Sequence, residues 1–140
     1  MDPDKKDYLS MIQEPISRLS TTSSVVKGFA ATVVAGLAAL SYTGISKRVL
    51  ILSFLPIIAF TALDIYYLRL ERKFRGLYND VLSGEHEVDF SISLPKDKTF
   101  VKRAKANVWS CIKSPSIWLF YPVLYIVMTA VIILKCRGVI

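Results

Sequence analysis

Three stretches with almost no charged residues dominate this sequence and limit what it can fold into. They cover residues 28–46, 49–68 and 114–134, which is nineteen, twenty and twenty-one residues. A helix of about 20 apolar residues crosses the roughly 30 Å hydrocarbon core of a bilayer. Hydrophobic residues make up 53% of the 140-residue chain, more than a soluble domain of this size needs. The sequence therefore predicts an all-α integral membrane protein with three transmembrane helices.

The spans divide the chain into four expected regions. Residues 1–24 form a cytoplasmic amphipathic segment, in which the apolar face is interrupted by Pro15. Residues 25–68 form a transmembrane hairpin, 69–113 a basic cytoplasmic region, and 114–140 the third span with a short external tail. Pro56 and Pro122 lie within the second and third spans, where each removes a backbone donor and predicts a kink.

The distribution of Lys and Arg predicts the orientation. On one side lie thirteen of them, namely Lys5, Lys6, Arg18 and the ten between residues 69 and 113. The first loop and the C-terminal tail hold four, and Lys27 borders the first span. Cytoplasmic loops of membrane proteins carry the excess of positive charge. We therefore expect a membrane protein with its N-terminus in the cytoplasm and its C-terminus outside.

The second span continues into the charged region without a break. Apolar residues at helical spacing predict one helix over Val49–Leu82, of which the last part is a cytoplasmic stalk. Gly76 weakens this prediction, because a glycine inside a helix costs about 1 kcal/mol. The alternating segment "VDFSISL", residues 88–94, predicts a short strand that pairs with another subunit or docks on the stalk; the alternative is an extended segment only.

The segment "KTFVKRAKANVWSCIK", residues 98–113, predicts a basic amphipathic helix. One interpretation is an interfacial helix whose lysines contact anionic lipid. The other is a surface for a polyanion, on which an aromatic ring stacks against bases. The candidate ligand-binding residues are Lys98, Lys102, Arg103, Lys105, Trp109, Lys113, Arg69, Arg72 and Lys73.

Small residues mark the first span. They recur at helical spacing and include Gly28, Ala31, Ala35, Gly36 and Ala39, with Thr32 between them. Small side chains let helix backbones approach closely, which is how spans associate in lipid. The row predicts either packing within one subunit or the seam of an oligomer.

Asp64 is the one carboxylate inside a span. Such a group faces the interior of a bundle or a water-filled cavity, because exposure to lipid is costly. It either pairs structurally, with Arg69 or with a hydroxyl group such as those of Thr32 and Ser41, or lines an ion pathway.

No motif of a nucleotide-binding loop, a metalloprotease or a catalytic triad occurs, and the chain has a single histidine, His86. The two cysteines, Cys111 and Cys136, are too few for a disulfide framework. We expect no enzyme, no metal site and no cofactor.

Several stretches resemble a family of small bacterial membrane proteins, among them membrane effectors of phage-defence operons such as the Hailong system. They are "MIQEPISRLS", "VVKGF", "ALDIYYLRLERKFRGLYNDV", "VDFSISL" and "SPSIWLFYPVLY". The resemblance implies a homo-oligomeric ion channel of the bacterial inner membrane, with a tetramer favoured. The channel would be gated from the cytoplasm by an anionic nucleotide or single-stranded DNA. An operon-encoded nucleotidyltransferase would supply this ligand. The alternative is a membrane anchor that conducts nothing and holds a soluble partner enzyme.

The predicted orientation is tested by labelling cells with a membrane-impermeant thiol reagent. In a chain whose native cysteines are replaced by serine, Gly138→Cys should react and Glu85→Cys should not, because the positive loop stays inside. Labelling at residue 85 without labelling at residue 138 would reverse the topology.

Overall fold

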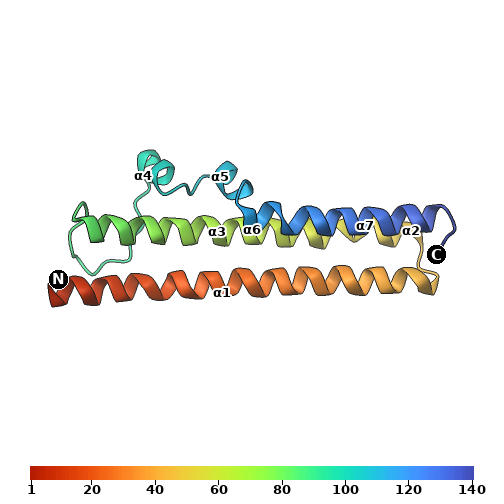
Figure 1. Ribbon diagram of the computed structural model, residues 1–140, viewed down its shortest axis with the longest axis horizontal. Coiled ribbons are helices and arrows are strands. Elements are labelled where there is room, and N and C mark those ends of the chain that lie inside the picture. The colour runs from red at the N-terminus through yellow and green to blue at the C-terminus, as the bar shows by residue number, and fades with distance from the viewer. The chain divides into compact units, whose positions relative to one another are not determined.

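A computed structural model describes all 140 residues, and every regular element in it is a helix. In chain order (Figure 1) they are α1 (Pro3–Leu40), the 3₁₀ turn η1 (Ser41–Thr43), α2 (Lys47–Leu52), α3 (Phe54–Ser83), α4 (Lys98–Arg103), α5 (Val108–Ile112), α6 (Pro115–Trp118) and α7 (Phe120–Cys136). Two compact units result. Unit 1 contains residues 1–23 and 65–112, and unit 2 contains residues 24–64 and 113–140.

Two helical segments, Pro3–Thr43 and Lys47–Ser83, are long and apolar enough to cross a membrane. The count rises to three if the helices on either side of Leu119 are taken as one span. The prediction of an all-α protein is therefore confirmed, with two or three helical segments long and apolar enough to cross a membrane.

Prolines explain where the apolar helices break. α2 ends at Leu52 and α6 ends at Trp118, in each case four residues before a proline, Pro56 or Pro122. A proline ring clashes with the carbonyl of the residue four positions earlier, and it provides no N–H for that carbonyl. The helix expected over Val49–Leu82 is therefore present as one helical segment, Lys47–Ser83, with a one-residue break at Ser53 close to the kink expected at Pro56.

Pro15 behaves differently, because it lies inside α1 without ending it. The N-terminal amphipathic segment and the first span are consequently one helix of 38 residues, and its buried face includes Ile12 before Pro15 and Ile16 after it.

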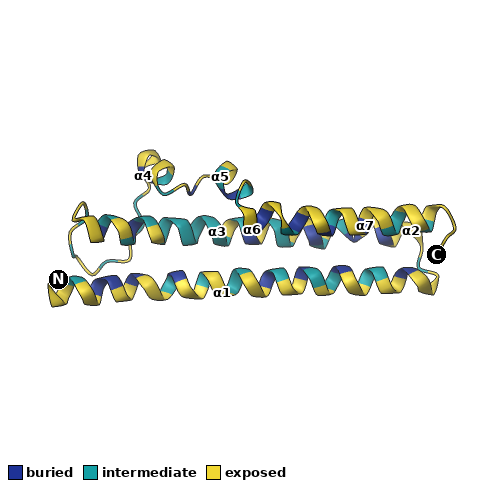
Figure 2. Ribbon diagram, in the orientation of Figure 1, coloured by how far each residue is buried: buried dark blue, intermediate teal, exposed yellow.

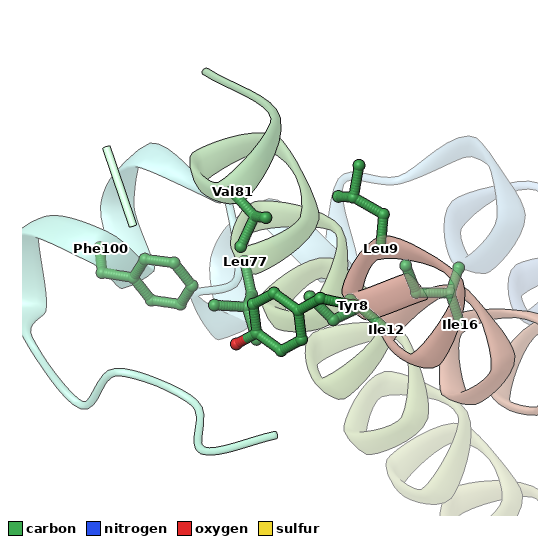
Figure 3. Packing of buried hydrophobic residues seen from close by; sticks show 7 residues of the cluster. All are labelled: Tyr8, Leu9, Ile12, Ile16, Leu77, Val81 and Phe100. Atoms are coloured by element: carbon green, nitrogen blue, oxygen red, sulfur yellow. The ribbon is translucent and has the colours of Figure 1, made fainter. Parts of the chain in front are cut away.

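The core of unit 1 joins three helices (Figure 3). Its buried side chains are Tyr8, Leu9, Ile12 and Ile16 from α1, Leu77 and Val81 from α3, and Phe100 from α4. They lie three or four residues apart along α1 and α3, so each helix presents one apolar stripe to the others. The apolar stripe of the stalk is thus covered by the N-terminal segment, as its spacing suggested.

The segment over residues 88–94 forms no strand, so the strand prediction is wrong. Its polar groups bond to side chains instead: the Tyr8 hydroxyl donates to Asp89 Oδ1 at 3.0 Å and to the Ser91 carbonyl at 2.6 Å. The Ser91 amide also donates to Asp89, and this bond lowers the pKa of that carboxyl group. A positive φ of 54° at Phe90 breaks the alternation that a strand requires. The segment docks on the unit 1 core through Val88 and Leu94.

Unit 2 is tied together at the ends of its helices. α2 packs beside α7, and the rings of Phe54 and Tyr125 stack with centroids 6.1 Å apart. Lys135 Nζ, near the end of α7, donates to the Ser41 carbonyl at 2.6 Å. Exposed residues, yellow in Figure 2, occur along all of these helices.

Gly76 permits the close approach of α4 to α3. A Cβ atom at this position would lie 2.8 Å from the Cβ of Ala104 and 3.2 Å from the Phe100 ring. Real Cβ atoms do not approach so closely, because repulsion rises steeply below van der Waals contact. The glycine that weakens the helix in isolation is therefore required by packing.

Gly76→Ala should destabilise the protein by about 1–3 kcal/mol through this overlap, although alanine is the better helix former. Thermal unfolding in detergent measures the change. Ser10→Ala is the control, since Ser10 is exposed inside α1 and alanine is the better helix former, and it should leave stability equal or slightly higher. A stabilising Gly76→Ala substitution would show that α4 does not pack against α3.

Candidate functional site

The basic region folds as two short helices rather than one. α4 and α5 are separated by an elbow at residues 104–107, where Lys105 has a positive φ of 52°. The single amphipathic helix expected over residues 98–113 is therefore wrong. Its lysines do not share one continuous face.

Two arginines of α3 hold the elbow. Arg69 Nε donates to the Ala106 carbonyl at 3.0 Å, and an Arg72 guanidinium nitrogen donates to the Lys105 carbonyl at 2.8 Å. The carbonyl groups of the elbow thus find cationic donors. Asn107 starts the next helix, because its side chain accepts the Ser110 amide at 3.0 Å. An asparagine at such a position is an N-cap signal that sequence reasoning missed.

Carboxylates engage the next group of arginines. Arg103 donates to Asp80 at 2.9 Å and to Glu85 at 2.8 Å. Arg75 pairs with Glu71 at 2.8 Å, as the four-residue spacing predicts. Arg72, Arg75, Arg103 and Lys105 line a cleft of about 320 Å³ between α3 and α4, together with Asp80 and Glu85. Both carboxylates of this cleft bind Arg103, so they offset only part of its positive charge.

A second hollow on unit 1 contains cations without partners. We call it the lysine groove; it has a volume of about 330 Å³ and is lined by Lys96, Lys98, Val101, Lys102 and Asn107. All three lysines are exposed and make no hydrogen bond or ion pair. Lys96 was missed because it lies before the expected helix, two residues from Lys98. This groove is the best candidate on the molecule for binding an anion.

The nine predicted ligand-binding residues therefore separate. Lys98 and Lys102 lie in the lysine groove, and Arg69, Arg72 and Arg103 hold the fold of unit 1. Lys105 lines the cleft between α3 and α4. Lys73 is half-buried and lines neither that cleft nor the lysine groove. Trp109 is 73% exposed on α5, and Lys113 belongs to unit 2.

A buried polar cluster lies in unit 2. Asp64 on α3 is fully buried, pairs with Lys27 of α1, and accepts a hydrogen bond from the Tyr121 hydroxyl of α7 at 3.0 Å. An ionised side chain is buried at tolerable cost only when it is paired and hydrogen-bonded. The three side chains hold three separate helices to one point.

The partners expected for Asp64 are wrong. Arg69 binds the elbow, while the hydroxyl groups of Thr32 and Ser41 donate to the carbonyls of their own helical turns, Gly28 at 2.8 Å and Ala38 at 2.6 Å. The sequence did not point to Lys27, because this residue lies just outside the first apolar stretch. The signal was present: Lys27 and Asp64 both lie at the predicted cytoplasmic end of an apolar stretch.

The small residues of the first span face outward. Gly28, Thr32, Ala35, Gly36 and Ala39 are exposed and Ala31 is half-buried. The residues of α1 that pack within unit 2 are instead Val26, Ala30 and Val34. Of the two alternatives for this row, packing within one subunit is wrong for its glycines, around which a Cβ meets nothing within 4 Å.

Comparison of the chain with protein-family models, with curated proteins and with solved structures finds no match. The resemblance to phage-defence effectors therefore stays an expectation.

Removing one member of the buried pair should be costly. Lys27→Met leaves the Asp64 carboxylate buried without its cation, and we expect a loss of about 3–5 kcal/mol in the free energy of unfolding. The double variant Lys27→Met/Asp64→Leu should recover most of this loss, because an apolar pair replaces the charges. Thermal unfolding in detergent measures both.

Thr32→Val is the control, since its hydroxyl group is exposed and binds only its own helix. If Lys27→Met were as stable as the wild-type protein, or the double variant no better than the single one, the pair would not support unit 2.

Proposed function

We propose that this chain is an integral membrane protein that assembles into a homo-oligomer, with a tetramer expected, and forms an ion pore. An anionic ligand bound at the lysine groove on the cytoplasmic side controls the pore. This function agrees with that implied by the resemblance to membrane effectors of bacterial anti-phage defence.

The outward-facing apolar surface of unit 2 carries the membrane proposal. Large apolar side chains that are more than half exposed occur along its helices, among them Phe29, Ile51, Leu55, Trp118 and Ile126. The charges of Lys27 and Asp64 are turned inward and paired. Apolar surface outside with polar groups satisfied inside is the arrangement that a hydrocarbon solvent favours.

Assembly is supported by the exposed row of small residues on α1. Gly28 and Gly36 lie on an open face, where a second copy could bring its backbone close. Two or three spans per chain are too few to surround an aqueous pathway, so conduction requires several copies. We therefore expect the pore at the centre of the oligomer.

The ligand proposal is supported by the three uncompensated lysines of the groove. Binding of phosphates by lysines releases counterions, so affinity for a nucleotide or single-stranded DNA should fall with salt. The chain carries a net charge of +7, which attracts such ligands at longer range.

One observation favours the alternative of a non-conducting anchor. The segment docked on unit 1 leaves Phe90 and Ile92 exposed, at 47% and 43%. Apolar side chains on a polar platform suit a protein partner, in which case unit 1 would hold a soluble enzyme at the membrane.

Reconstitution into liposomes separates the two functions. A channel should release a trapped ion and have a particle mass in nanodiscs of several chains. An anchor should release nothing. A monomeric particle without ion flux would contradict the pore.

The groove is tested with a single-stranded thymidine oligonucleotide as probe. Lys98→Glu/Lys102→Glu should abolish its binding, and wild-type affinity should fall with a log–log salt slope of about −0.7 for each phosphate contacted. Lys6→Glu/Arg18→Glu makes the same change in charge at exposed positions of α1 and should bind nearly as wild type. Equal losses in both double variants would indicate binding by net charge without a site.

A further inference from the structure

We propose that α5 lies on the surface of an anionic bilayer, with the Trp109 ring among the lipid headgroups. The inference rests on the proposed membrane location of unit 2. It assigns Trp109 to lipid, so the ring is not part of the ligand site.

The burial of α5 gives the helix two different faces. Cys111 is completely buried and burial raises the pKa of its thiol, whereas Val108 and Trp109 are 43% and 73% exposed. The preceding elbow is fastened to α3 by the bond from Arg69 to the Ala106 carbonyl. The indole is therefore held outward by a helix whose other side is packed. No ring of the chain stacks on it.

The short chain segment between Trp109 and the last apolar stretch limits how far the indole ring can lie from the end of the span. Trp109 precedes Pro115, where the apolar helices of the last stretch begin, by only six positions. Six residues reach about 20 Å when fully extended, and residues 108–112 are helical and therefore shorter. The ring thus stays near the end of the span, at the depth where tryptophan is enriched in membrane proteins.

The charge around α5 fits anionic lipid. Lys105 and Lys113 are exposed just before and just after the helix, neither forms an ion pair, and no acidic residue lies between them. Lysines close to a membrane surface are attracted by its anionic headgroups. The lysine groove does not include the indole among its lining residues. These observations favour lipid over a stacked base as the partner of Trp109.

The chain contains two tryptophans, which makes the test direct. Trp118→Phe leaves Trp109 as the single indole, and Trp109→Phe leaves Trp118. Each variant of the full chain is reconstituted into vesicles of phosphatidylcholine and phosphatidylglycerol, in which the acyl chains are brominated close to the glycerol. We expect the fluorescence of Trp109 to fall at least twofold, and less so in vesicles without phosphatidylglycerol.

The control variant separates this inference from the proposed function. Quenched Trp118 with unquenched Trp109 would overturn the surface position of α5 and leave the membrane location intact. Two unquenched tryptophans would overturn both. Trp109 that is quenched by added thymidine oligonucleotide but not by brominated lipid would identify it as a stacking platform and would also overturn the inference. Equal quenching with and without phosphatidylglycerol would show that Lys105 and Lys113 do not bind anionic headgroups, and would overturn the anionic character of the surface.

Discussion

A carboxylate buried in apolar surroundings is the constraint on which unit 2 depends. Burying the Asp64 carboxylate there is costly unless a cation and a hydrogen-bond donor face it. Lys27 and Tyr121 supply them from two other helices, so the requirement of one charge brings α1, α3 and α7 together. Buried pairs of this kind add little stability over an apolar pair. Any other packing of the helices, however, would leave a buried charge without its partner. The cluster therefore favours one arrangement of helices that are otherwise uniformly apolar.

Unit 1 uses its charges differently. Its arginines bind backbone carbonyls and carboxylates, and they thereby hold α4 and the elbow against α3, where Gly76 leaves room. The planar guanidinium group with several donors suits this role better than an ammonium group. The lysines of the groove and those flanking α5 stay exposed and without ion pairs. The division between the two residue types gives the basic region both a fixed shape and a free positive surface.

These two arrangements are consistent with one function. Unit 2 offers an apolar exterior and an exposed row of small residues, which suit a bilayer and a second copy of the chain. Unit 1 offers free lysines. α1 and α3 run through both units, so a ligand on unit 1 and the spans of unit 2 share two continuous helices. In the proposed channel these helices would carry the signal.

The sequence by itself determined the helical class, the apolar stretches, the breaks near Pro56 and Pro122 and the stripe of the stalk, because these depend on spacing along one chain. It did not determine the partner of Asp64, the elbow at Lys105 or the conformation of residues 88–94. Each of these depends on contacts between residues far apart in the chain, as between Lys27 and Asp64 or Tyr8 and Ser91. Local periodicity cannot distinguish an arginine that binds a distant carbonyl from a lysine left in solvent. Only the tertiary structure decided which cations are structural and which remain available.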